Sequence, residues 1–327
     1  MISDNGKRQR FPPKVPSDDT SHWGVILAGG DGTRLRSLTR QITGDDRPKQ
    51  FCPIFGDESL LGRTRRRVAR TVAPERIVAV LTKAHERFYA PLIRQVPSHL
   101  LVVQPENRGT SPAILYGLLR IAKMAPTASV ALFPSDHYLS DDEAFMAHVR
   151  VAFDGVLRRP ELVTLLGISP AYPETAYGWI EPGQPIFGNG RPAIFRVRRF
   201  WEKPKPVLAQ TLLAEGGPWN SFVMVARVAT LLALIESADP DLYHTFLGLW
   251  PVLNTHDEEA TIATLYAGLP STNFSEQVLA SRPEDLAVLP VGGVQWSDLG
   301  EPGRVLSVLA QSGVRMNRAM APTLISA

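Results

Sequence analysis

Short apolar runs alternate with helix-like segments along the first half of the sequence, and this alternation restricts the fold more than any other feature. Apolar runs at 24–28, 77–82, 100–104 and 129–134 are each followed by a segment of helical pattern. Strands that are apolar at consecutive positions are buried on both faces, which is typical of parallel sheets covered by helices. The sequence therefore predicts an α/β fold with an open, mostly parallel sheet and helices on both faces.

The pattern changes near residue 160. Runs at 162–168, 177–180 and 194–201 have the composition of further strands, with glycine and proline between them. Strands separated by such turn residues are typical of antiparallel pairing. We therefore expect a first, Rossmann-like half at about 22–160 and an inserted, smaller antiparallel half at about 161–300.

The two ends of the sequence differ from its middle. Residues 1–21 are polar and contain prolines without the apolar core of a secretory signal, so we expect a disordered tail. Residues 301–327 have the pattern of one short helix and a tail. No apolar run approaches the roughly 18 residues of a membrane-spanning helix, so no membrane partner is expected.

The composition excludes several classes of protein. The net charge is only +3, and no basic stripe with interleaved aromatic residues occurs, so we expect no nucleic-acid partner. The densest basic cluster, at 63–67, lies in a helix-like segment and is typical of a solvated face. The single cysteine, Cys52, rules out an internal disulfide and a zinc site of several cysteines, and it predicts a packing role in a cytoplasmic protein.

The first apolar run ends in a glycine-rich loop that suits phosphate groups. Gly29, Gly30 and Gly32 follow the run directly, and Thr33 and Arg34 close the loop. Glycines after a strand let backbone N–H groups converge on an anion, and an arginine adds a planar fork for phosphate oxygens. The spacing excludes both the Walker sequence and the dinucleotide-binding Gly-x-Gly-x-x-Gly. A purely structural turn with a solvated arginine remains the alternative.

Two other polar loops, at 104–110 and 134–137, also follow predicted strands directly. In open α/β sheets, ligands bind beyond the carboxyl ends of the strands. We therefore expect these loops and the glycine loop to converge on one rim of the sheet.

Eight short motifs, several of them in loops after predicted strands, occur in this order: LAGGDGTRL (27–35), PKQF (48–51), RGTSPAI (108–114), PSDH (134–137), YGWI (177–180), WEKP (201–204), WNS (219–221) and WSDLG (296–300). In number and order they resemble the sugar-phosphate nucleotidyltransferases. Within that family the sequence is most similar to the mannose-1-phosphate guanylyltransferases, or GDP-mannose pyrophosphorylases. The resemblance covers residues 23–300 and identifies the two halves as a nucleotide half and a sugar-binding half.

The resemblance implies a nucleotidyl transfer. An oxygen of a sugar 1-phosphate attacks the α-phosphorus of a nucleoside triphosphate, which gives a nucleotide-sugar and pyrophosphate with Mg²⁺ as cofactor. The subgroup implies GTP, mannose 1-phosphate and the product GDP-mannose. The same chemistry with another base or sugar remains open, as does a non-catalytic nucleotide-sugar sensor, although the retained charged residues argue against a sensor.

The resemblance also assigns roles to residues, and such a reaction depends more on positioning and charge neutralisation than on covalent chemistry. The implied catalytic residues are Arg34, Lys49, Asp136 and Lys203, and the implied metal ligands are Asp136 and Asp298. The implied nucleotide-binding residues are Leu27, Ala28, Gly29, Gly30, Gly32, Thr33, Arg34, Gln104, Arg108, Thr110 and Asp136, and the implied sugar-phosphate-binding residues are Gly178, Glu202, Lys203 and Asn220.

Each of these residues has a structural alternative when it is taken alone. Asp136 or Ser135 would also cap a helix, Asp298 would also serve in a turn, and Lys203 would also be plain surface charge. His137 suits hydrogen bonding or packing better than direct chemistry. The number and order of the motifs favour the functional interpretation.

The sequence departs from the family pattern at several places. Phe222 follows Trp-Asn-Ser where a glycine is usual, Gly109 stands where an asparagine is usual, and Glu301-Pro302 replaces the usual Ser-Trp after Trp-Ser-Asp-Leu-Gly. We expect neither a β-helix nor a cupin domain, both of which some relatives carry. The sugar, the base and the oligomeric state stay open, a homodimer included.

Overall fold

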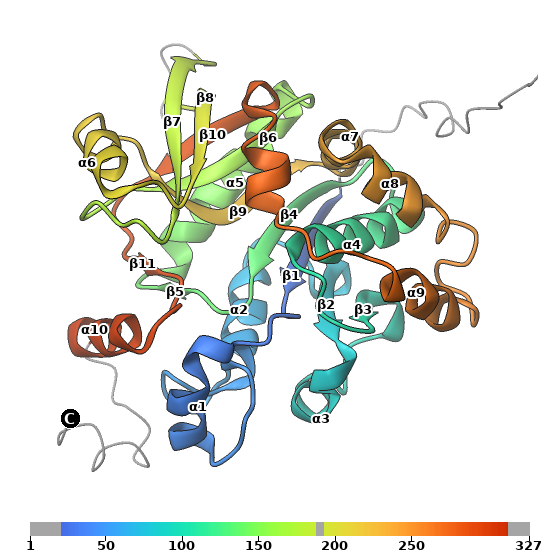
Figure 1. Cartoon of the computed structure of the whole chain (residues 1–327). Helices are drawn as coiled ribbons and strands as arrows, with labels where there is room; N and C mark the ends of the chain where they lie inside the picture. The colour runs from blue at the N-terminus through green and yellow to red at the C-terminus, as the bar shows by residue number, and fades with distance from the viewer. Residues whose placement is uncertain (1–20, 188–192, 313–327) are drawn as a thin grey trace, which may run out of the picture.

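The computed structural model describes residues 21–187 and 193–312, in which a twisted sheet of nine strands runs through the molecule (Figure 1). Across the sheet, the strands follow in the order β3 (Leu101–Gln104), β2 (Ile77–Thr82), β1 (His22–Leu27), β4 (Ser129–Pro134), β9 (Trp219–Arg227), β6 (Val163–Ile168), β10 (Leu286–Val291), β8 (Phe195–Glu202) and β7 (Gly178–Pro185).

The sheet is mixed, which corrects the expectation of a mostly parallel one. Strands β3, β2, β1 and β4 are all parallel, but β9 pairs antiparallel with both β4 and β6. Beyond β9, β6 and β10 are parallel to each other, and β8 and β7 are antiparallel to their neighbours. The second half of the chain therefore extends the same sheet instead of forming a separate one.

Helices cover both faces of the sheet, as expected. Alternate strand residues point to opposite faces: Val25 and Val80 lie in one core cluster, while Ile26 and Leu81 lie in another. The first cluster contains apolar residues of α4 (Thr110–Met124), α7 (Val228–Ala238), α8 (Pro240–Leu247) and α9 (Glu258–Ala267). The second contains apolar residues of α2 (Leu60–Val68), α3 (Glu86–Tyr89), α5 (Asp142–Arg158) and α6 (Pro206–Ala214). Figure 1 shows α4, α7 and α8 grouped over one face.

A third, smaller cluster joins the two ends of the described chain at the rim of the sheet. It contains Leu35, which directly precedes α1 (Arg36–Thr43), and Leu38 of that helix. It also contains Leu299, and Val305 and Leu309 of α10 (Pro302–Ser312). A two-stranded ribbon of β5 (Tyr138–Leu139) and β11 (Trp296–Ser297) lies beside it. This ribbon brings the segments that carry Asp136 and Asp298 together.

Two predicted helices are shorter in the structure than in the sequence pattern. The segment of helical pattern that follows the apolar run at 77–82, residues 83–95, breaks at Pro91 into a 3₁₀ turn, the four-residue α3 and another 3₁₀ turn. Residues 239–267, whose sequence pattern also indicates one helical stretch, divide into α8 and α9. The expected tail at 1–21, apart from its last residue, lies outside the described residues, and so does 313–327. Within the described residues, no helix is both long and apolar enough to span a membrane.

Candidate functional site

Two adjoining cavities open where strands of both halves end. A cavity of about 390 Å³ and one of about 300 Å³ share Gly30, Asn107 and Asp136 in their walls. Of the residues predicted for the site, the larger cavity is lined by Leu27, Gly29, Gly30, Gln104, Thr110, Asp136, Gly178, Glu202, Asn220 and Asp298. The smaller cavity is lined by Gly30, Gly32, Thr33, Arg34, Lys49 and Asp136.

The glycine loop between the cavities is tied down through its carbonyl groups. The Gln50 side chain donates from Nε2 to the carbonyl oxygens of Ala28 (3.0 Å) and Gly30 (2.7 Å), and Thr82 Oγ1 donates to that of Gly29 (2.9 Å). Among the described residues, none accepts a hydrogen bond from the backbone N–H groups of residues 29–32. Four backbone donors in one glycine-rich loop suit an anion.

Two glycines of this loop are required by geometry. A Cβ at Gly29 would lie 2.6 Å from Gln104 Nε2 and 2.8 Å from Thr82 Oγ1. Gly32 has φ 60°, in the left-handed region, and a Cβ there would lie 3.0 Å from the backbone N of Lys49. The loop can therefore pass close to its neighbours only because these side chains are absent.

Lys49 connects the two segments that carry the predicted metal ligands. It belongs to the 3₁₀ turn Lys49–Phe51, and its side chain is buried. Its Nζ lies 3.0 Å from Asp136 Oδ2 and donates to the backbone oxygens of Asp298 (2.7 Å) and Leu299 (3.1 Å). Asp136 and Asp298, 162 positions apart in sequence by their numbers, thus meet around one ammonium group.

Asp298 is held by donors on one side of its carboxylate. Its Oδ1 accepts hydrogen bonds from Arg304 Nη1 (2.7 Å), from the Gly300 backbone N–H (2.8 Å) and from the Tyr177 hydroxyl (3.3 Å). Burial by itself would raise the pKa of Asp298, but the positive charges of Arg304 and Lys49 contribute to a net pKa below the ordinary value. Asp298 is therefore an ionised carboxylate at neutral pH.

His137 packs against the site as a neutral ring. Trp296 Nε1 donates to His137 Nδ1 at 3.2 Å, and the two rings meet edge to face with centroids 5.1 Å apart. Burial lowers the pKa of His137 to about 4, although Asp136 and Asp298 act in the opposite direction. The hydrogen-bonding and packing role expected for His137 fits this arrangement.

Three predicted site residues do not line either cavity. Ala28 is buried in the core, and only its carbonyl group contributes, by accepting from Gln50. Arg108 points to Glu106, with 2.7 Å between its Nη2 and Oε1 of the glutamate. The Lys203 side chain is 56% exposed and lies 3.2 Å from Glu202 Oε1. The roles assigned to these residues stay predictions.

The wall of the larger cavity that is predicted to bind the sugar, which includes Gly178, Glu202 and Asn220 and is called the sugar-side wall below, is crowded. A Cβ at Gly178 would lie 3.0 Å from Glu202 Oε2, so glycine leaves room for that carboxylate. Phe222 lines the larger cavity with φ 60°, and its backbone N–H donates to Asn220 Oδ1 at 3.1 Å. Its ring packs against Phe274, with centroids 6.3 Å apart.

Sequence reasoning missed Gln50, Thr82, Asn107 and Arg304 as parts of the site. Gln50 lies inside the PKQF motif, so its motif was a usable signal. Thr82 ends an apolar strand, and Asn107 lies in a loop already expected at the rim. Arg304 had no signal, because it follows a departure from the family pattern. Cys52 packs in the third cluster, where burial raises its pKa to about 12.

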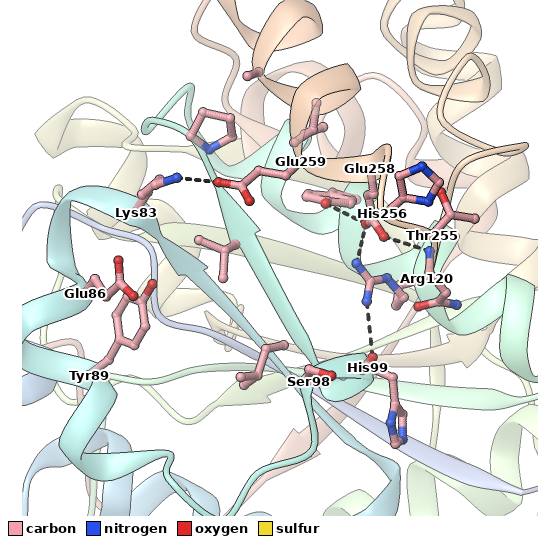
Figure 2. A pocket seen from close by; sticks show the side chains of 17 residues that line it. Lys83, Glu86, Tyr89, Ser98, His99, Arg120, Thr255, His256, Glu258 and Glu259 are labelled. Carbon is pink, nitrogen blue, oxygen red and sulfur yellow. Dashed lines mark hydrogen bonds and ion pairs between the residues drawn. The ribbon is translucent and has the colours of Figure 1, made fainter.

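A third cavity, of about 560 Å³, is larger than these two and lies elsewhere, between β3, α3 and α9 (Figure 2). In Figure 2, Lys83 faces Glu259, and Arg120 lies between Glu258 and the backbone of His99. These charged groups are already paired with each other across the cavity. Because the free backbone donors and the Lys49 cluster lie at the two smaller cavities, we place the candidate site there.

The donor set of the site fits a hard divalent cation. Within the described ranges, no group of three or more His, Cys, Asp or Glu side chains could hold a metal ion. However, Mg²⁺ is commonly bound by one or two carboxylates together with substrate phosphates. The hydrogen bonds to the Asp298 carboxylate fall on Oδ1, which leaves Oδ2 available among the described contacts. Asp136 and Asp298 therefore fit a magnesium site that a phosphate completes.

Comparison with known proteins identifies the family of this chain. The Nucleotidyl transferase family matches residues 23–311. The xanthan biosynthesis protein XanB of Xanthomonas campestris pv. campestris (strain B100) is 33% identical over 297 residues, which cover 88% of this chain and 60% of that protein. The mannose-1-phosphate guanylyltransferase of Escherichia coli (strain K12) is 32% identical over 287 residues, or 84% of this chain and 57% of that protein. This chain thus spans about three fifths of the length of these relatives.

A solved structure gives the same result for the fold. A crystal structure described as a mannose-1-phosphate geranyltransferase from Thermus thermophilus has a TM-score of 0.74 and 30% identity, covering 88% of this chain and 79% of that one. The resemblance seen in the sequence motifs is thereby confirmed at the level of the family. The chain belongs to the nucleotidyl transferase family.

Proposed function

We propose that this protein joins GTP to mannose 1-phosphate and releases GDP-mannose and pyrophosphate. One observation carries this: the free backbone donors of residues 29–32 and the Lys49–Asp136–Asp298 cluster face the same pair of cavities. The relatives named mannose-1-phosphate guanylyltransferase support the choice of substrates. In the reaction, a phosphate oxygen of the sugar phosphate attacks the α-phosphorus, and the bond from that phosphorus to pyrophosphate breaks.

The residues divide between the two substrates. The glycine-loop amides and the exposed Arg34 bind the triphosphate, which they suit as donors to phosphate oxygens. Lys49 neutralises charge near the α-phosphate, where the negative charge develops. Glu202, Asn220 and the backbone at Gly178 bind the sugar, since they line the sugar-side wall of the larger cavity.

Lys203 takes part from the edge of the sugar pocket. Its side chain is exposed and paired with Glu202, so it can reach a phosphate that enters beside that carboxylate. Asp136 and Asp298 would hold the cofactor Mg²⁺, which supplies positive charge against the phosphates when bound.

A pyrophosphate-release assay across the four common ribonucleoside triphosphates and several sugar 1-phosphates tests the proposal. Release with GTP and mannose 1-phosphate well above every other pair is the expected result. Release with a different pair would retain the chemistry and reject the substrates. No release on any pair, with nucleotide-sugar binding intact, would instead identify a sensor.

One observation favours the alternative of another sugar or base. Phe222 lines the larger cavity together with Asn220, at a position where the family pattern given by the sequence motifs has glycine. A modified or smaller substrate than mannose 1-phosphate would fit such a pocket. We expect the same residues to carry the transfer in that case.

A further inference from the structure

Arg304 connects two parts of the candidate site, although it lines neither cavity. From the first turn of α10 (Pro302–Ser312), its Nη1 lies 2.7 Å from Asp298 Oδ1 and its Nη2 lies 2.9 Å from Glu174 Oε2. Its guanidinium carbon lies 4.4 Å from the centroid of the Tyr177 ring. One guanidinium group therefore binds the predicted metal ligand and the loop before β7 at the same time.

A positive charge at this end of α10 is electrostatically unfavourable for the helix. A cation in the first turn of a helix is disfavoured by the helix dipole, which is positive at that end. Two carboxylates offset this, and the Arg304 side chain is only 13% exposed. An arginine held in this way has a fixed planar fork that a lysine cannot reproduce.

The contacts of Arg304 determine the orientation of the Asp298 carboxylate. All described hydrogen bonds to the Asp298 carboxylate fall on Oδ1, and Arg304 makes the shortest of them. A carboxylate that is anchored through one oxygen has lost most of its rotational freedom. The other oxygen is then oriented before any ligand arrives, which lowers the entropy lost on binding.

The Nη2 atom of Arg304 contacts Glu174, which lies in the loop before β7. Glu174 accepts from the Ala176 backbone N–H through Oε1 (2.9 Å), and Tyr177 donates to Asp298. Ala176, Tyr177 and Gly178 all line the larger cavity. A shift of Arg304 would therefore move Asp298 and the wall of the sugar pocket together.

We propose that Arg304 is a positioning residue that orients Asp298 for a divalent cation and couples cation binding to sugar 1-phosphate binding. This rests on the proposed function of the site. The ligand that Asp298 would bind is a hard divalent cation. The affinity of a protein for such a cation depends on the groups that form hydrogen bonds or ion pairs with the coordinating carboxylate. Removal of such supporting groups typically lowers metal affinity by about 10–100-fold.

Binding of Mn²⁺, measured by the electron paramagnetic resonance of the free ion, tests the proposal without relying on turnover. Arg304→Ala should weaken Mn²⁺ binding by about tenfold or more, and Arg304→Lys should restore only part of it. Glu174→Gln removes one charge partner of Arg304 and should have a smaller effect on Mn²⁺. It should still raise the Michaelis constant for mannose 1-phosphate.

Matched controls separate positioning from general stability. Ser307→Ala lies on the exposed side of the same helix, and Arg282→Ala removes an arginine before β10 that pairs with Asp285. Both should keep wild-type Mn²⁺ affinity. Thermal unfolding of every variant shows whether a loss of affinity reflects a loss of fold, and Arg304→Lys serves if Arg304→Ala does not fold.

The outcomes distinguish this inference from the proposed function. The role of Arg304 is overturned if folded Arg304 variants bind Mn²⁺ with an affinity within twofold of wild type. It is also overturned if an active wild type binds Mn²⁺ no better than Asp298→Asn does. Either result leaves the proposed function standing. A wild type without turnover on any substrate pair, but with Mn²⁺ binding that depends on Arg304, rejects the function and supports the positioning role.

Discussion

At the scale of single residues, Lys49 joins the two segments that carry the predicted metal ligands. Its ammonium group is buried between Asp136 and the backbone oxygens of residues 298 and 299. Lys203, by contrast, is exposed and has one acidic neighbour. The two lysines should therefore contribute to different steps of the reaction.

We expect Lys49→Ala to lower turnover and Lys203→Ala mainly to raise the Michaelis constant for the sugar 1-phosphate. Loss of one charge-assisted hydrogen bond costs roughly 1.5–3 kcal/mol, which is about a ten- to hundredfold effect. Steady-state kinetics with each substrate varied in turn measures both constants. Similar changes in the same constants for both variants would contradict this division.

Phe222 has a strained backbone and lines the larger cavity. A non-glycine residue at φ 60° is strained, by about 1–2 kcal/mol in the left-handed region. Phe222→Gly removes that strain, loses the contact with Phe274 and widens the larger cavity. We expect a changed order of preference among sugar 1-phosphates, read as kcat/KM over a panel. An unchanged order would show that the ring does not determine the sugar.

At the scale of elements, the sequence predicted strands better than their directions. The apolar runs at 77–82 and 129–134 coincide with β2 and β4, because a strand buried on both faces must be apolar throughout. The same apolar pattern fits either direction of pairing, so it could not show that β9 is antiparallel. Helices were overestimated where Pro91 interrupts one pattern and where Gly248 and Pro251 interrupt another.

The start of α4 depends on one glycine. Gly109 has φ 86° and forms a bridge with Thr272, and a Cβ there would lie 2.2 Å from the Thr272 oxygen. Next to it, Thr110 Oγ1 accepts a hydrogen bond from the Phe274 backbone N–H at 2.8 Å. This junction joins the loop at the nucleotide side to the segment that supports Phe222.

We expect Gly109→Ala to lower the free energy of unfolding by about 2 kcal/mol or more, since a side chain here meets both a forbidden φ and a backbone oxygen. Urea denaturation followed by circular dichroism measures the change. Gly268→Ala is the matched control, because that glycine has open space around it and no positive φ. Equal free energies of unfolding for the two variants would show that the backbone at Thr272 can move to accommodate a side chain at position 109.

At the scale of the whole molecule, the site draws on nearly the full described length of the chain. The glycine loop comes from the first strand, Asp136 from the end of β4, the sugar-side wall from β7 to β9, and Asp298 and Arg304 from the last helix and its approach. The motifs predicted most of these participants, because polar loops after parallel strands share one rim. Arg304 could not be assigned in this way, since it lies outside the motifs and its role arises from tertiary contacts alone, whereas Gln50 lies inside the PKQF motif.

Asp136 and Asp298 would both be ligands of one metal ion. Triphosphate and sugar phosphate bring several negative charges beside Asp136 and Asp298, and Lys49 is already shared between those segments. We therefore expect turnover to collapse in a chelator and to return with Mg²⁺. Asp136→Asn and Asp298→Asn should each lower turnover by about 10²–10³-fold, the scale of losing one preorganised electrostatic group.

The double variant is the decisive comparison, because ligands of one ion act as a unit and their losses do not multiply. Asp136→Asn with Asp298→Asn should be little slower than either single variant, as measured by pyrophosphate release at saturating Mg²⁺. Thermal unfolding supplies the control, since Asp136→Asn removes the carboxylate that faces Lys49 and Asp298→Asn removes one that faces Arg304, so each variant must be shown to remain folded. Losses that multiply in the double variant, or turnover that survives chelation, would mean that the two carboxylates act separately and hold no common ion.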